Sequence, residues 1–293
     1  MRKRGFHILV ATDASPQARA AVDTALAFPW PEGSRAQGVM VTAVSGLNRW
    51  RRRARAALLP WLRQESLRVQ RRLRRRWPDA DVVLVNPPVV KTIAERARQS
   101  RADVIVLGSR GGDALHRALR GSVSRDVVHE ADCAVFVVKG KARSPRRLLI
   151  GLDGSVRSRR AVAFVSRLAR PAGARVTVLA VVEPISSPSI SRLPSSVRAV
   201  LAAELAALDR KRMTRARREV STAARRLTRA GWAVRKVVRR GIPLAALLKT
   251  ASATHTDVTI IGARSATGLA RLLLGSVAEG TVAHSSGSVL VVR

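Results

Sequence analysis

The sequence predicts an α/β protein built from two tandem copies of a doubly wound, five-stranded parallel sheet. Three observations support this prediction. Short apolar runs alternate with helical patterns, which is typical of a parallel sheet covered by helices on both faces. The order of these segments repeats once, and 293 residues suffice for two domains of about 150 residues each. In both copies a glycine-containing loop follows the fourth apolar run.

The first copy begins with an apolar strand, Phe6–Val10, that leads into Ala11-Thr12-Asp13. Ser15 and Pro16 then mark a helix start, because serine caps a helix and proline suits its first position. The further strands are valine-rich runs, and the helices carry apolar residues at helical spacing. The strands are expected at 39–44, 82–85, 104–107 and 134–138; the helices are expected after Ser15, at 49–76, around 93–97 and around Leu115 and Leu119.

The second copy follows a charged linker, 139–147, so the domains are expected at 1–140 and 141–293. We expect two Rossmann-like domains packed as a pseudo-dimer through their last strands. The second set of strands is expected at 148–150, 176–182, 234–238, 258–261 and 289–292. A long helix from about Arg198 to Ala230 is expected to bury Leu201, Leu205, Leu208, Ala216, Val220 and Leu227.

The two copies differ in length between their second and third strands. The offset between them is 140 residues at Asp13 and Asp153, and 154 residues at Gly108 and Gly262. The serine- and proline-rich stretch 183–196 accounts for the insertion, and its composition predicts an exposed loop. It is a spacer or a lid over the second copy.

The composition excludes several classes of protein. A single cysteine, Cys133, excludes an intrachain disulfide and favours a reducing compartment. The five histidines lack metal-ligand spacing, so we assign no metal site. No apolar run reaches the ~18–20 residues that span a bilayer, and we expect a cytoplasmic protein without a membrane partner.

The charge is unusual, because 55 basic residues face 19 acidic ones and give a net charge of +36. Such a field attracts polyanions, and nucleic acid is a candidate partner for the arginine-rich helices at 49–76 and 210–229. The alternative is a general bias toward arginine, with these residues filling solvated helix faces.

The chemistry of a binding site is concentrated in the loop Gly108-Ser109-Arg110-Gly111 and in Gly121-Ser122. The loop lies between an apolar strand and a helix, which is the order that a phosphate-binding loop needs. Glycines let backbone amides approach an anion closely, and a helix start adds its positive end. Asp13 also follows a strand, so one crevice at the carboxyl edge of the sheet can hold both elements.

These motifs resemble the universal stress protein (UspA) family, in a tandem two-domain form that covers nearly the whole chain. The resemblance lies in the strand endings at Asp13 and Asp153 and in a G-x2-G-x9-G-[S/T] loop. It implies that ATP, with or without Mg²⁺, is bound by the loop, that Asp13 contacts the ribose, and that the backbone near Val44 meets adenine. The implied contacts are Asp13, Val44, Gly108, Arg110, Gly111, Gly121, Ser122 and Val123 in the first copy, and Asp153, Val181, Gly241, Gly262, Gly275 and Ser276 in the second.

Each copy departs from the family pattern at one place. Ser265 stands where the second loop needs its middle glycine, and serine is disfavoured where φ is positive. In the first copy, Pro87-Pro88-Val89 replaces the turn Gly241-Ile242-Pro243. Because phosphate contact is the more demanding requirement, we expect the working site in the first copy.

We therefore expect a stress-response protein that binds an adenine nucleotide. No GxxxxGK[S/T] loop or other catalytic constellation is present, so an enzyme activity is not assigned, although slow ATP hydrolysis and autophosphorylation stay open. An adenine-nucleotide alpha-hydrolase-type enzyme is a weaker alternative. The main alternative is a basic interaction protein that needs no nucleotide, and a homodimer of the pseudo-dimer is a further option.

Overall fold

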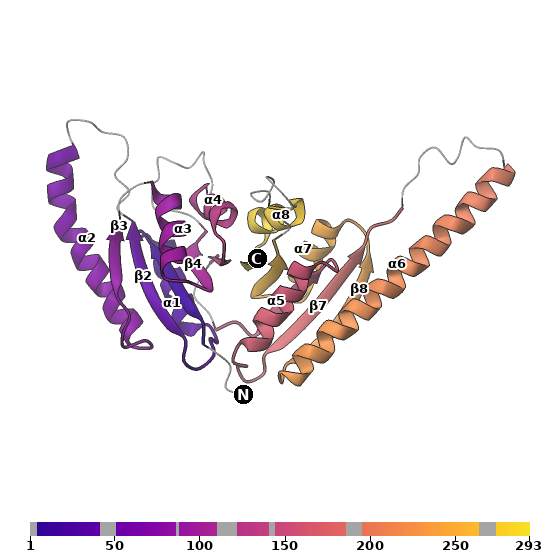
Figure 1. Cartoon of the computed structure of the whole chain (residues 1–293), viewed down its shortest axis with the longest axis horizontal. Coiled ribbons are helices and arrows are strands. Elements are labelled where there is room, and N and C mark those ends of the chain that lie inside the picture. Colours follow the sequence, from indigo (N-terminus) through magenta and orange to yellow (C-terminus); the bar gives the residue numbers. More distant parts are fainter. Residues whose placement is uncertain are drawn as a thin grey trace.

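The computed structural model describes residues 5–41, 51–85, 88–109, 122–140, 144–185, 195–263 and 274–293. Their ten strands form a single sheet in the order β3-β2-β1-β4-β5-β10-β9-β6-β7-β8. Helices cover both faces of this sheet, and the long helices α2 and α6 lie at its two ends (Figure 1). The chain is thus an α/β protein with two halves of the same topology, as the sequence predicts.

Within its described residues, the first half contains five strands and four helices. Its parallel strands follow the order of a doubly wound sheet, in which the chain moves from β1 outward to β3 and then returns to the other side of β1. The elements are β1 (His7–Thr12), α1 (Pro16–Ala27), β2 (Arg35–Val41), α2 (Arg51–Arg74), β3 (Val82–Val85), α3 (Val89–Gln99), β4 (Val104–Gly108), α4 (Ser122–Glu130) and β5 (Ala134–Val138).

The second half repeats this order. Its elements are β6 (Arg147–Leu152), α5 (Val156–Arg167), β7 (Arg175–Val182), α6 (Ser195–Arg229), β8 (Ala233–Arg240), α7 (Pro243–Ala253), β9 (Val258–Gly262), α8 (Ser276–His284) and β10 (Ser288–Val292).

The two halves are joined by β5 and β10, which pair in antiparallel register. Val137 lies opposite Val289, Phe136 opposite Leu290, and Val135 opposite Val291. Every residue of both strands is buried. The prediction that the halves pack through these strands is confirmed, and the two predicted five-stranded sheets are in fact one. An unpaired valine-rich edge would expose backbone hydrogen-bonding groups, and this pairing removes both inner edges.

Two layers of apolar side chains fill the space between the sheet and its helices. One layer packs under α1, α2, α5 and α6, and it runs without a break from one half into the other. Aromatic rings cross the junction on this side, since Phe6 lies 4.5 Å from Phe164 between ring centroids. The backbone N–H of Ala169 also donates to the carbonyl of Pro29 at 2.8 Å. The other layer packs under α3, α4, α7 and α8.

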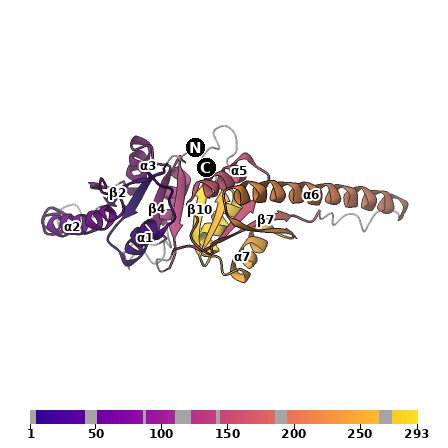
Figure 2. The same cartoon turned by 90° about the horizontal axis from the view of Figure 1, so that it is seen from below.

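The long helix α6 differs from its prediction in its first half. Leu201 and Leu208, expected in the core, are 36% and 48% exposed, whereas Ala216, Val220 and Leu227 are buried. The first half of α6 projects beyond the sheet (Figures 1 and 2), so only the second half has a sheet surface to cover. Apolar helical spacing thus identified the helix and its buried C-terminal part. It did not show where along the helix the contact with the sheet ends.

Other predictions can be compared element by element. The second strand begins at Arg35, four residues before the predicted start, and residues 42–44 of that prediction lie outside the described residues. The helix expected around Leu115 and Leu119 also lies outside them, as does most of the insertion 183–196. The amphipathic helix predicted at 49–76 is confirmed by α2, with Leu62, Val69 and Leu73 buried.

The junction makes a direct prediction for Phe136, which is fully buried in β5 with its ring centroid 4.9 Å from that of Phe28. Replacing Phe136 by alanine leaves a cavity where the two halves meet, and we expect the free energy of unfolding to fall by about 3–5 kcal/mol. Urea denaturation measures this change. Val156→Ala, at a position that is 57% exposed, serves as the control and should change stability by less than about 0.5 kcal/mol. A loss below about 1 kcal/mol for Phe136→Ala would contradict the continuous core.

Candidate functional site

The candidate site in each half lies at the carboxyl ends of its two central strands. In the first half, β1 lies between β2 and β4, and the chain changes direction across the sheet between β1 and β4. Asp13 follows β1, and Gly108 ends β4. In the second half, Asp153 follows β6 and Gly262 ends β9, on the equivalent pair of strands. Ligands of open α/β sheets bind in such crevices, where the strand order reverses.

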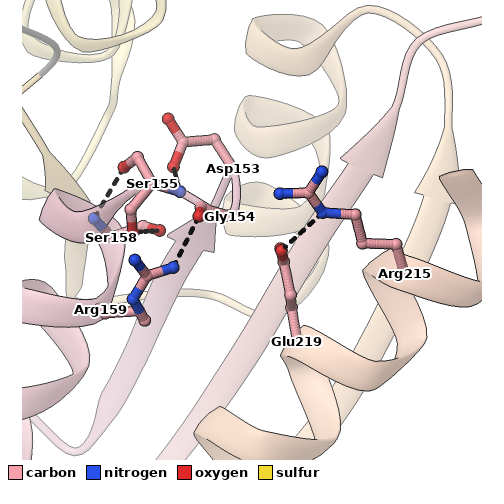
Figure 3. Close-up of polar contacts among 7 residues, drawn as sticks. All are labelled: Asp153, Gly154, Ser155, Ser158, Arg159, Arg215 and Glu219. Atoms are coloured by element: carbon pink, nitrogen blue, oxygen red, sulfur yellow. Dashed lines mark hydrogen bonds and ion pairs between the residues drawn. The ribbon is translucent and has the colours of Figure 1, made fainter.

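Both aspartates take part in the turn that starts the next helix. In the second half, Asp153 Oδ1 accepts a hydrogen bond from the N–H of Ser155 at 2.9 Å, and Ser155 Oγ accepts one from the N–H of Ser158 at 3.1 Å (Figure 3). The turn in the first half repeats this arrangement, with Asp13 Oδ1 and the N–H of Ser15 at 3.0 Å. Each carboxylate therefore holds the N-terminal end of a helix.

The ionisation of Asp153 reflects these contacts. Desolvation is the largest single influence and acts to raise the pKa of Asp153. Hydrogen bonds from the hydroxyl and N–H of Ser155, from Ser158 and from the Asp153 backbone act together in the other direction and hold the pKa below its ordinary value. A carboxylate at this place is an acceptor for hydroxyl groups, and its charge disfavours direct contact with a phosphate.

The residue after each aspartate adopts a left-handed backbone conformation. Gly154 has φ of +78°, and Ala14 in the first half has φ of +64°. Glycine adopts this region without strain, whereas alanine does so at a cost. The first half therefore contains a strained residue beside its candidate aspartate, and the second half does not.

An arginine closes each turn, and sequence analysis did not identify it. Arg159 donates from Nη1 to the carbonyl oxygen of Gly154 at 2.8 Å, and Arg19 donates from Nε to that of Ala14 at 3.2 Å. Both arginines lie four residues after the capping serine. The identical spacing in two copies was the available signal, but the large number of arginines in the chain concealed it.

The first glycine of each loop has a packing role. A Cβ at Gly108 would lie 2.9 Å from backbone atoms of Gln17, and a Cβ at Gly262 would lie 2.7 Å from the backbone carbon of Arg157. Because these contacts are with the first turn of α1 or α5, any side chain would push the strand end away from the helix. The two glycines thus bring the start of each loop onto the N-terminal turn of a helix.

A carboxylate from α6 faces the turn of the second half. Glu219 lies close to Gly154, since a Cβ on that glycine would be 2.5 Å from Glu219 Oε1, and Glu219 pairs with Arg215 at 3.2 Å (Figure 3). The residue at the same register of α2 is Glu65, which is buried and pairs with Arg68. Neither carboxylate was singled out from the sequence.

The other predicted site residues fall into two groups. Val181 is half-buried near the end of β7, and the N–H of Gly241 donates to the carbonyl of Val182 at 3.1 Å, so these two predicted contacts are close together. Gly241 has φ of +140°, which proline cannot adopt. Gly275 caps α8, Ser276 begins it, Ser122 begins α4, and Val123 is 38% exposed. Val44, Arg110, Gly111 and Gly121 lie outside the described residues, as does Ser265.

Three further findings concern metal binding, thiol chemistry and membrane spans. Among the residues that the structure describes, no group of three His, Cys, Asp or Glu side chains could hold a metal ion. Burial raises the pKa of Cys133 to about 12, so this thiol stays protonated near neutral pH. No helix in the described part of the chain is long and apolar enough to cross a membrane.

A family model described as the universal stress protein family matches residues 6–139 and, a second time, residues 145–293. The chain belongs to the universal stress protein family. The double match agrees with the two halves of the sheet, and the predicted tandem arrangement is thereby confirmed.

Sequence relatives of this universal stress protein occur in several bacteria. It is 30% identical over 223 residues to universal stress protein Mb2028c of Mycobacterium bovis, covering 72% of this chain and 68% of that one. It is 28% identical over 222 residues to a universal stress protein of Mycolicibacterium smegmatis, covering 70% and 66%. A protein of Synechocystis is 46% identical over 59 residues, which cover 20% of this chain and 53% of that one.

Solved structures share the fold along nearly the whole chain. A universal stress protein from Archaeoglobus fulgidus superposes with a TM-score of 0.65 at 19% identity, covering 98% of this chain and 96% of that one. The protein PA1789 of Pseudomonas aeruginosa gives a TM-score of 0.57 at 18% identity, with 98% and 92% covered.

The turns after Asp13 and Asp153 allow the cost of a positive φ to be measured. Gly154→Ala should lower the free energy of unfolding by about 1–2 kcal/mol, because alanine is strained at positive φ. Gly173→Ala is the matched control, since Gly173 has φ of +73° with nothing within 4 Å of the added Cβ. The excess cost at position 154 then measures the displacement of Glu219. Ala14→Gly should leave stability unchanged or raise it by up to about 1 kcal/mol. Thermal and urea unfolding measure all three variants, and a stabilising Gly154→Ala would contradict the analysis.

Proposed function

We propose that this universal stress protein binds an adenine nucleotide, with ATP as the preferred ligand, in the crevice of its first half. The observation that carries the proposal is the pairing of Asp13 with the start of a complete G-x2-G-x9-G-S loop at the point where the strand order reverses. In this arrangement Asp13 binds the hydroxyl groups of the ribose, and the glycine loop binds the phosphates.

Charge explains why the aspartate would bind the ribose while the loop binds the phosphates. The carboxylate of Asp13 repels phosphate oxygens but accepts hydrogen bonds from hydroxyls. Backbone amides in a glycine loop and at a helix start supply donors for phosphate without a cationic side chain. Packing of Gly108 on the first turn of α1 fixes where this loop begins. In the proposal, Gly111, Gly121 and Ser122 carry the loop onward, and Mg²⁺ enters only with the phosphates.

The first half is favoured over the second because its loop keeps all three glycines. Ser265 replaces the middle glycine of the second loop, where a side chain disfavours a positive φ. The second half does retain Gly241, Gly262, Gly275 and Ser276, so a weaker second site is consistent with the proposal. We assign no residue of either half to ATP hydrolysis.

Isothermal titration with ATP tests the proposal through a matched pair of variants. Gly121→Asp places a carboxylate in the phosphate loop of the first half, and Gly275→Asp places one at the corresponding position of the second. We expect saturable binding by the intact protein, at least a tenfold loss of affinity in Gly121→Asp, and little change in Gly275→Asp.

Circular dichroism and thermal unfolding verify that both variants are folded. A larger loss in Gly275→Asp than in Gly121→Asp would move the site to the second half. The absence of saturable binding by the intact protein would contradict nucleotide binding altogether.

A second candidate function, binding of nucleic acid without nucleotide, rests on the arrangement of charge. The outer strand β8 exposes Arg235, Lys236, Arg239 and Arg240, and the adjacent helix α6 carries many further arginines. Such clusters on one end of a molecule attract the phosphates of nucleic acid.

Electrophoretic mobility shift with duplex DNA across a salt series tests this second function. If six or more phosphates are neutralised, affinity should fall by about 10³-fold or more between 50 and 200 mM salt. Charge reversal at Arg235 and Arg239 should reduce both the affinity and the salt dependence. Failure to bind at low salt would contradict this function and would leave the nucleotide proposal untouched.

A further inference from the structure

The helix α4 connects the proposed nucleotide site to the second half of the molecule. It begins at Ser122, where the glycine loop ends, and it ends at Glu130. In its first turn, Ser124 Oγ donates to the carbonyl of Ser109 at 3.4 Å, so the helix start lies beside the start of that loop. With nine residues, α4 is a short rod of roughly 13 Å. A contact that holds its C-terminal end therefore also fixes the position of its N-terminal end.

The C-terminal end of α4 is held by the second half. Arg293, which follows β10, donates from Nη2 to the carbonyl oxygens of Val128 and His129, the latter at 2.7 Å. His129 Nε2 also lies 3.1 Å from Oε1 of Glu279 in α8, the neighbouring helix of the second half (Figure 1). The last carbonyls of a helix have no partner within it and carry partial negative charge, so a guanidinium suits them well.

The guanidinium of Arg293 is partly withdrawn from water. Its Nε is buried and has no hydrogen-bond partner among the residues that the structure describes. Burial lowers the pKa of Arg293 from its ordinary value, the charge of Arg157 acts in the same direction, and the carboxylate of Asp132 opposes both. A charge in such surroundings interacts strongly with nearby dipoles, because little water screens it.

The first half holds the second in the same way. The offset of 154 residues relates Arg293 to Lys139, the residue that follows β5. Lys139 Nζ donates to the carbonyl of Ser285, which caps the C-terminal end of α8, at 2.8 Å. The backbone N–H of Lys139 also donates to Ser288 Oγ at 3.0 Å. Both copies thus place a cation directly after the last strand and direct it to the end of a helix in the other copy, so this contact is a repeated feature of the fold.

We propose that Arg293 of the second half is a positioning residue for the nucleotide site of the first half. It acts through α4, because holding the carbonyls at one end fixes where the N–H groups at the other end meet the phosphates. This role rests on the proposed binding of ATP in the first crevice and adds that the site depends on both halves. Asp13, on the ribose side, belongs to the turn after β1, so we expect it to be independent of this contact.

Isothermal titration of the full chain with two ligands tests this role. ATP carries phosphates, whereas adenosine, measured by its displacement of ATP, carries only the ribose and the base. Arg293→Met should weaken ATP binding by about fivefold, because the start of α4 is no longer held in place, and should leave adenosine within about twofold of the parent. Arg293→Lys copies Lys139 and keeps the charge, so it should retain most of the ATP affinity.

Arg98→Met is the matched control, because Arg98 of α3 pairs at the same end of α4, with Glu130 at 3.5 Å and with Asp132 at 3.0 Å. These pairs are made with exposed side chains rather than with helix carbonyls, so ATP binding should stay within about twofold of the parent. Equal weakening in Arg98→Met and Arg293→Met would show a general effect of charge and overturn the proposal.

The remaining outcomes separate this role from nucleotide binding itself. Unchanged ATP affinity in Arg293→Met would overturn the role of Arg293 and leave nucleotide binding standing, whereas no ATP binding by the parent would overturn both. A parallel loss of ATP and adenosine would show general structural damage and would also overturn the role. Thermal unfolding verifies that the variants are folded. If Arg293→Met does not fold, Arg293→Gln, which keeps a donor but no charge, takes its place with the same expected selectivity.

Discussion

The antiparallel pairing of β5 with β10 is the contact on which the rest of the structure depends. Three residue pairs from Val135 to Val137 and from Val289 to Val291 join ten strands into one sheet. Both strands would otherwise be valine-rich edges open to other chains. The pairing also brings the two halves into contact beside the sheet, where the Phe6 ring meets the Phe164 ring and the N–H of Ala169 donates to the carbonyl of Pro29. A tandem duplication allows the two halves to carry different side chains at such contacts, which an interface between identical chains does not permit.

The glycines show how one residue type can serve packing and binding together. Gly108 and Gly262 are required because each strand end meets the backbone of the first helical turn in its own half, α1 or α5. The same contact places the first residue of each loop beside a helix start, and a helix start favours anions. Asp13 and Asp153 likewise have a structural role, since each accepts a hydrogen bond within the turn that starts a helix. The fold itself therefore requires these glycines and aspartates, with or without a ligand.

Much of the fold was predictable from the sequence, because strong apolar periodicity and an internal repeat support each other. The strands, the tandem topology and the joining strands all follow from runs such as Ala134–Val138. The exposed first half of α6 did not, since Leu201 and Leu208 have the spacing of buried residues but lie beyond the reach of the sheet. For the site, the sequence located Asp13 and Gly108 at one edge. It did not reveal Arg19 or the strained Ala14, whose roles depend on backbone dihedral angles and on one hydrogen bond.

We propose that only one half of this two-fold molecule, the first, holds the working nucleotide site. Native mass spectrometry of the intact chain titrated with ATP tests it most directly, because it counts bound ligands on each molecule. We expect the species with one bound nucleotide to form first, and a second nucleotide to bind only at much higher concentration, if at all. Two nucleotides bound with equal affinity, or none at any concentration, would contradict it.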